Sequence, residues 1–144
     1  MGRRRVRMGD LRETTHRTGR AEATRYSAWM PVYAQCLDLV DDPDLIREYV
    51  DAHRNVPKAV EQALRAIGIE RMRIHRLGSR LYMTIETREG FDPARDYQRY
   101  AQMPGAAAWD ARMRKYQRPA PGAGPSEWWA AMEPVYVLTA DAGG

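Results

Sequence analysis

The chain contains a single cysteine, Cys36, and three histidines among its 144 residues. One cysteine excludes an internal disulfide, and no cluster of cysteine and histidine has the spacing of a metal site. We therefore expect no bound metal and assign no residue as a metal ligand. Cys36 lies in an apolar run, where it is expected to be a small buried hydrophobic residue.

Long hydrophobic runs and several enzyme motifs are also missing. No run approaches the roughly 20 apolar residues that cross a bilayer, and the N-terminus lacks the apolar core of a secretion signal. We therefore expect a soluble, cytoplasmic protein without a membrane partner. No glycine-rich phosphate loop, HExxH helix motif or GxSxG turn occurs, which argues against nucleotide-driven and metallohydrolase chemistry.

Lysine is scarce, since only Lys58 and Lys115 occur, and the basic charge is concentrated at the N-terminus. Residues 1–20 hold seven arginines against Asp10 and Glu13. A basic arm can bind nucleic acid through its phosphates, but the arginine bias runs through the whole chain, so nucleic acid is an unlikely partner. The length and the apolar share of 44% suit one domain. We expect a flexible basic arm over residues 1–29 and a single domain over residues 30–144.

The first half of the domain reads as a strand followed by a broken helix. Residues Val32–Val40 are mostly apolar on both faces, which favours a strand buried on both sides. Asp42 is a suitable helix cap, with proline following it in the first turn. Pro57 should break the helix before Ala59–Ile67 resume it, and Gly68 can end that segment with positive φ.

Two extended runs, Ile69–Leu77 and Arg80–Thr87, flank the two-residue turn Gly78–Ser79 and should pair as an antiparallel hairpin. The segments that follow are expected to be a helix from Asp92 to Tyr100, a helix over Ala106–Tyr116, a loop over Arg118–Pro125 and a last strand over Pro134–Thr139.

The order strand, helix, strand, strand, helices, strand is the βαββαβ order of a ferredoxin-like α+β domain. Helices should cover one face of the sheet. The other face is expected to carry apolar and aromatic side chains. Because water does not tolerate a large apolar area, we expect a homodimer that joins two sheets face to face.

His53 is the leading candidate for proton transfer, because an imidazole titrates near neutral pH and can act as acid or base. Tyr49 precedes it by four residues, so a helix places phenol and imidazole on one face. The alternatives are a histidine on a helix surface and a tyrosine that is part of the core. Trp109, Trp128 and Trp129 could stack on the apolar face of a sugar ring or could fill the core or the dimer interface.

Four pieces of the chain, in their order and spacing, carry a resemblance to a known family. They are Tyr49-x-x-x-His53-x-x-x-Pro57, the run Met72–Met83, Trp109 before Tyr116, and Glu127–Trp128. From Val32 to Leu138 the sequence resembles the L-rhamnose mutarotase superfamily, and more closely its L-fucose mutarotase-like branch.

The resemblance implies a dimeric α+β barrel, with His53 as the proton donor and with Tyr49 and Trp109 in contact with the sugar. Met72 and Trp128 complete the expected substrate-binding set. At Met72 the rhamnose branch has a tyrosine, whereas the fucose-like branch is similar to this chain. Val56 and Lys58 differ from the family, which usually has tryptophan and glutamate there.

The reaction implied is the interconversion of the α and β anomers of a 6-deoxyhexose, L-fucose rather than L-rhamnose. This chemistry needs no cofactor, because it involves no redox step, carbanion or phosphoryl transfer. The second acid/base group stays open between Tyr49, water and Glu133. The alternatives are a non-catalytic sugar-binding protein and another cofactor-free enzyme on the same barrel, such as an oxygenase with an almost entirely apolar pocket.

Overall fold

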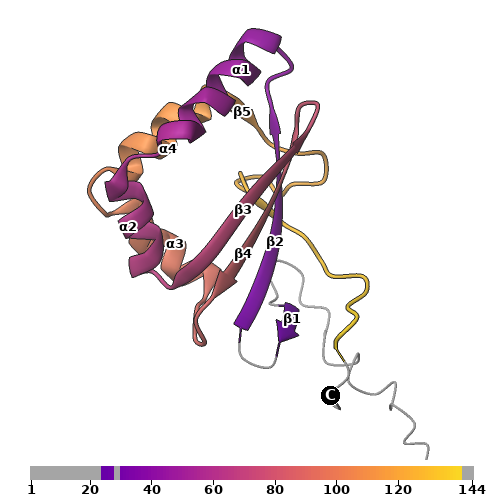
Figure 1. The fold of residues 1–144 in the computed structure, drawn as a ribbon. Helices are drawn as coiled ribbons and strands as arrows, with labels where there is room; N and C mark the ends of the chain where they lie inside the picture. The colour runs from indigo at the N-terminus through magenta and orange to yellow at the C-terminus, as the bar shows by residue number, and fades with distance from the viewer. Residues whose placement is uncertain (1–23, 28–29, 141–144) are drawn as a thin grey trace, which may run out of the picture.

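The structure is a computed structural model that describes residues 24–27 and 30–140. Within the arm expected at residues 1–29, the segment Thr24–Ser27 forms the short strand β1. The remainder of that arm lies outside the described residues. The helices lie together on one side of an antiparallel sheet, and the other side of the sheet carries no helix of the described chain (Figure 1).

The sheet is built from three long strands, β2 (Met30–Leu39), β3 (Ile69–Leu77) and β4 (Arg80–Thr87). They lie in the order β2-β4-β3, and each neighbouring pair is antiparallel. Gly78, with φ of 58°, forms the expected two-residue turn between β3 and β4. Because the helices that follow β2 return the chain to β3, with β4 between the two, the domain has the split βαβ arrangement of a ferredoxin-like α+β fold.

The helices begin and end where the sequence has capping or breaking residues. They are α1 (Pro43–Ala52), the 3₁₀ turn η2 (His53–Asn55), α2 (Lys58–Ala66), α3 (Pro93–Ala101) and α4 (Ala106–Arg114). The carboxylate of Asp42 accepts the amide hydrogens of Asp44 and Leu45, and Asp92 caps α3 in the same way. Val56 is extended ahead of Pro57, which separates η2 from α2. In the described part of the chain, no helix has the length and apolar character to cross a membrane.

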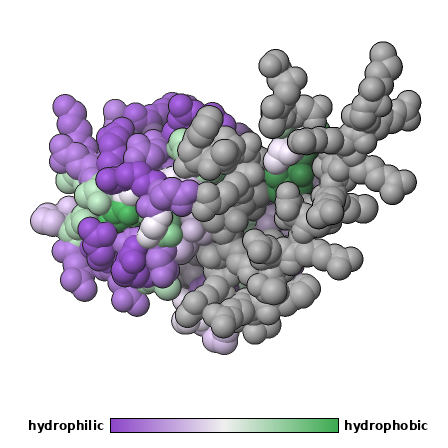
Figure 2. Space-filling model, turned by 90° about the horizontal axis from the view of Figure 1, so that it is seen from below, coloured by the Kyte–Doolittle hydropathy of each residue, from purple (hydrophilic) through white to green (hydrophobic). Residues whose placement is uncertain are grey.

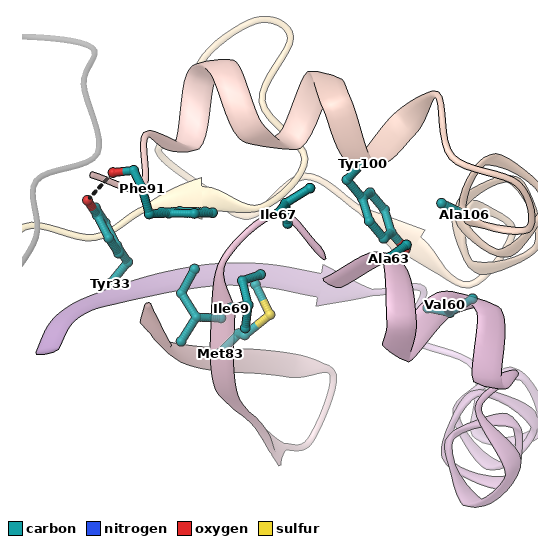
Figure 3. Close-up of a cluster of buried hydrophobic side chains, with 10 residues drawn as sticks. Tyr33, Val60, Ala63, Ile67, Ile69, Met83, Phe91, Tyr100 and Ala106 are labelled. Atoms are coloured by element: carbon teal, nitrogen blue, oxygen red, sulfur yellow. Dashed lines mark hydrogen bonds between the residues drawn. The ribbon is translucent and has the colours of Figure 1, made fainter. Parts of the chain in front are cut away.

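The register of the three long strands sets which side chains face the helices. Two cross-strand rows face that side, Met72–Ile85–Tyr33 and Ile74–Met83–Gln35. In Figure 3, Met83 lies beside Ile69 and Tyr33 lies beside Phe91, and the same cluster contains Val60 and Ala63 of α2, Ile67, and Tyr100 of α3. A second cluster, centred on Leu37, Leu39 and Leu81, holds α1 against the other end of the sheet.

The last strand expected at Pro134–Thr139 is not present, so this prediction is wrong for the single chain. Residues 132–140 have no strand, and a two-residue strand β6 (Ala130–Ala131) precedes them. A fourth strand would need the edge of β2 that lies opposite β4. That edge is occupied by β1, β6 and a two-residue strand β5 (Gln117–Arg118), each paired with a different part of β2.

The helix-free face of the sheet is mixed in character, whereas an apolar face was expected. Ala34, Cys36 and Tyr82 lie on it, but the adjoining strand β3 presents Arg73 and His75. The alternation of side chains along β3 places Met72 and Ile74 on the helix side and Arg73 and His75 on the other side. Seen from below, the coloured part of the surface in Figure 2 is mainly hydrophilic and its hydrophobic residues form small areas.

Asp96 anchors α3, the helix that contributes tyrosines to the site described below. Its side chain is 1% exposed and its carboxylate accepts the amide hydrogen of Asp92 and pairs with Arg95 and Arg99. The hydrogen bond from Arg95, assisted by those from Asp92 and Arg99, holds the pKa of this carboxyl well below its usual range despite burial.

We expect Asp96→Asn to lower the free energy of unfolding by about 1–3 kcal/mol at pH 7, because a buried charge-assisted network is lost. A lowered folded-state pKa stabilises the protein above the unfolded-state pKa of about 3.9, and this contribution disappears as the pH falls through the folded-state value. Urea unfolding at pH 7 and pH 3 should therefore show a smaller difference from the unsubstituted protein at pH 3. An equal difference at both pH values would contradict this account.

Candidate functional site

A cavity of about 940 Å³ lies between the helix-facing side of the sheet and the helices. Met72, Tyr33, Ile74, Met83 and Gln35, which belong to the two cross-strand rows, line it. The cavity lies where the two core clusters meet, since Ile74, Trp109 and Trp129 pack against both. Its size and its mixture of aromatic and polar side chains suit a small ligand.

His53 enters the cavity from the point where α1 turns into η2. Its backbone amide hydrogen points to the carbonyls of Val50 and Asp51, so the tightened turn leaves the carbonyl of Tyr49 free of that amide. The ring nitrogen Nδ1 of His53 lies 2.8 Å from the Tyr49 oxygen. Because a carbonyl only accepts, Nδ1 carries the hydrogen, and Nε2 of the neutral ring keeps its lone pair for proton transfer.

Tyr49 packs directly against His53, with ring centres 4.3 Å apart. Its side chain is 3% exposed and belongs to the second core cluster, although it also lines the cavity. Burial raises the pKa of the Tyr49 phenol to about 12, against a small opposing hydrogen bond from Gln117. Tyr49 is therefore a neutral phenol near pH 7, suited to hydrogen bonding and to fixing the imidazole rather than to carrying a proton.

Aromatic and sulfur-containing side chains form much of the remaining wall. The rings of Trp109 and His53 make a T-shaped contact, with a centroid distance of 5.3 Å and an interplanar angle of 73°. Arg114 lies over the Trp128 ring, 5.4 Å from its centre, and Met72 lines the cavity from β3. All the site residues expected from the sequence, His53, Tyr49, Met72, Trp109 and Trp128, thus lie around one cavity.

Gln35 is a site residue that sequence reasoning did not select. It is buried on β2, where its amide nitrogen donates to the Trp129 carbonyl at 3.3 Å and its amide oxygen accepts from the Tyr97 hydroxyl at 2.8 Å. Both bonds join elements far apart in the chain around the cavity. A glutamine inside an apolar strand was the available signal, because a buried amide requires partners.

Several further polar residues line the cavity and were also missed. They are Asp92, Gln98, Tyr100, Asp110, Gln117 and Glu127. These residues come from loops and helix faces whose relative positions depend on the tertiary fold. Val56 and Lys58 both differ from the residues usual in the family that the chain resembles. Val56 lines the cavity, whereas Lys58 is exposed and does not.

A comparison with solved structures supports the fold. Tetracenomycin F2 cyclase from Streptomyces glaucescens, a type-II polyketide cyclase, aligns with a TM-score of 0.58 over 76% of this chain and 97% of its own. The sequence identity is 19%, so this likeness shows the fold alone.

Sequence comparisons show the family. A UPF0734 protein of Dictyostelium discoideum is 47% identical over 110 residues, which is 74% of this chain and 88% of that protein. An L-fucose mutarotase of Xanthomonas campestris pv. campestris is 37% identical over 105 residues, 72% of this chain and 84% of that enzyme. The family model described as L-rhamnose mutarotase matches residues 32–138. The chain therefore belongs to the L-rhamnose mutarotase family.

Proposed function

We propose that this protein is a sugar mutarotase that interconverts the α and β anomers of a 6-deoxyhexose by general acid/base catalysis. The observation that carries the proposal is His53, an imidazole that lines a ligand-sized cavity and whose Nδ1 is hydrogen-bonded to the Tyr49 carbonyl, which leaves Nε2 without that partner. Family membership supports the same activity.

The polar lining of the cavity favours a sugar over an aromatic substrate. An enzyme for an aromatic substrate needs a pocket that is nearly all apolar, whereas a sugar needs donors and acceptors around its hydroxyl groups. Gln98 and Gln117 line the cavity together with the carboxylates of Asp92, Asp110 and Glu127. Trp109 and Trp128 supply aromatic surfaces for the apolar face of a pyranose.

L-fucose is the favoured substrate, and L-rhamnose is the alternative. The relative named L-fucose mutarotase covers 72% of the chain at 37% identity. Met72 lies on the cavity floor at the position where the rhamnose branch has a tyrosine, so no phenol reaches a sugar hydroxyl from that point.

The chemistry assigned to His53 is transfer of one of the two protons that mutarotation moves. Opening a cyclic hemiacetal requires removal of the anomeric hydroxyl proton and delivery of a proton to the ring oxygen. The aldehyde then rotates about its C1–C2 bond, and ring closure on the other face reverses both transfers. A positioned general acid or base typically contributes about 10²–10⁴-fold.

A homodimer forms part of the proposal, with the C-terminal segment as a contact between the two copies. Val135, Tyr136 and Leu138 are 98%, 71% and 77% exposed, which is unusual for apolar side chains on one short segment. The same segment has strong β-propensity, and the edge of β2 is already occupied within the chain. Packing against a second copy would bury these side chains.

We expect His53→Ala to abolish accelerated exchange between the anomers of L-fucose, because no other imidazole lines the cavity among the described residues. The exchange rate is measured by NMR saturation transfer, with L-rhamnose measured in parallel. His75→Ala is the matched control, since His75 is exposed on the helix-free face of the sheet and should leave the rate unchanged.

Loss of exchange with retained sugar binding in His53→Ala would establish His53 as a proton carrier. Exchange at the uncatalysed rate with the unsubstituted protein on both sugars would reject the proposed activity. Sugar binding without any accelerated exchange would identify a non-catalytic binding protein on the same fold.

We expect the double variant Val135→Asp/Leu138→Asp to shift the protein from dimer to monomer, because charges would replace buried apolar contacts between copies. Light scattering after size-exclusion chromatography should give about twice the chain mass of 16.5 kDa before substitution and one chain mass after it. Leu77→Asp is a control, since Leu77 is 85% exposed at the hairpin. A monomeric unsubstituted protein would refute the homodimer.

A further inference from the structure

An acidic side chain, Asp110, lines the same cavity as the proposed proton carrier His53. Asp110 follows Trp109 on α4, and the Trp109 ring meets the His53 ring at a centroid distance of 5.3 Å. Asp110 is half-buried and lines the same cavity. A carboxyl group that lines the cavity can act as a general acid or base on a sugar bound there.

The partners of Asp110 leave part of its carboxyl group available. The Tyr100 hydroxyl donates to Oδ1 at 3.4 Å, which is a long hydrogen bond. Within the described part of the chain, Oδ2 accepts no hydrogen bond from the protein. Burial raises the pKa of the Asp110 carboxyl, although the hydrogen bond from Tyr100 and the charge of Arg114 oppose the shift. The other charged or titratable groups that line the cavity are Tyr33, Tyr49, His53, Asp92, Tyr97 and Glu127.

The other acidic groups of the cavity are engaged in structural hydrogen bonds. Asp92 caps α3 by accepting the amide hydrogen of Ala94. The two oxygens of Glu127 accept the amide hydrogens of Gly124 and Ala131. Asp110 differs from both, because its one protein hydrogen bond in the described structure comes from a phenol.

The candidates considered from sequence for the second proton-transfer group are weaker. Tyr49 holds its proton too tightly near pH 7, with a pKa of about 12. Glu133 is exposed and does not line the cavity. Among protein side chains of the described structure, Asp110 is therefore the better placed group.

We propose that Asp110 is the second acid/base group of the site and works with His53 on opposite oxygens of the sugar hemiacetal. This inference rests on the proposed mutarotase function.

The proposed step needs no further reactant. Nε2 of neutral His53 takes the proton from the anomeric hydroxyl, the C1–O5 bond breaks, and its electron pair goes to the ring oxygen. Protonated Asp110 gives its proton to that oxygen, which leaves an open-chain aldehyde between imidazolium and carboxylate. Rotation about C1–C2 and the reverse transfers close the ring as the other anomer and restore both groups.

The pair is active when it holds one proton between its two members. Removing that proton or adding a second one stops the step, so the rate should have a bell-shaped pH dependence with two macroscopic pKa values that belong to the pair. Tyr100 is a positioning residue in this scheme, because it holds Oδ1 by a hydrogen bond that stabilises the carboxylate.

The test compares Asp110→Asn with the unsubstituted protein in anomer exchange by NMR across pH. We expect kcat to fall by about 10²-fold or more, with a much smaller change in KM, because the amide keeps the shape of the carboxyl but transfers no proton. The bell should lose one limb and leave a single titration. Asp51→Asn, an exposed aspartate on α1 paired with Arg54, is the matched control and should behave as the unsubstituted protein.

A second variant, Tyr100→Phe, separates catalysis from structural support. Removing the phenol takes away a bond that lowers the pKa of Asp110, so the limb that Asp110 controls should move to higher pH while both limbs persist. An unchanged kcat in Asp110→Asn, or a raised KM with kcat intact, would overturn the assignment and leave the mutarotase function standing. No accelerated exchange by the unsubstituted protein would overturn both.

Discussion

The register of β2, β4 and β3 is the constraint on which the rest of this structure depends. It places the rows Met72–Ile85–Tyr33 and Ile74–Met83–Gln35 on the side that faces the helices. The same rows supply core contacts and most of the cavity floor. Because side chains alternate along a strand, a slip of one residue would turn these side chains outward and replace them with Arg71, Arg73 and Thr84. Core and site would be lost together.

A second constraint is the early end of α1, which sets the orientation of the His53 ring in the cavity. The residue before a proline disfavours the helical conformation, and Val56 is extended ahead of Pro57. The helix therefore closes in a 3₁₀ turn, which releases the Tyr49 carbonyl from its usual amide partner and offers it to Nδ1 of His53. The 3₁₀ turn at the end of α1 thus orients the imidazole and places the hydrogen of the ring on Nδ1.

Some residues of the site could be predicted from local spacing in the sequence. Others reach the site only through tertiary packing. His53 and Tyr49 share one helical repeat, so local spacing was enough to predict that their rings would meet. Gln35, Tyr97 and Trp129 are joined by hydrogen bonds across much of the chain, and no local period relates them. Asp110 had a weak signal, as a carboxylate next to a predicted site tryptophan, but its burial and its bond from Tyr100 depend on how α3 packs on α4.

The local elements could be predicted from the residues alone. They are the Asp42 cap, the break at Pro57, the hairpin at Gly78 and the βαββ order that follows from them. These features depend on backbone stereochemistry and short-range hydrogen bonds, which neighbouring residues dictate. The conformation of Pro134–Thr139 depends on the tertiary structure. The segment has the residue pattern of a strand, but three short strands already pair with the edge of β2 that it would need. Packing of distant segments also brings the polar groups of the cavity together. A strand needs a second strand to pair with, and a buried polar group needs a hydrogen-bond partner, and in both cases the partner comes from a distant part of the chain.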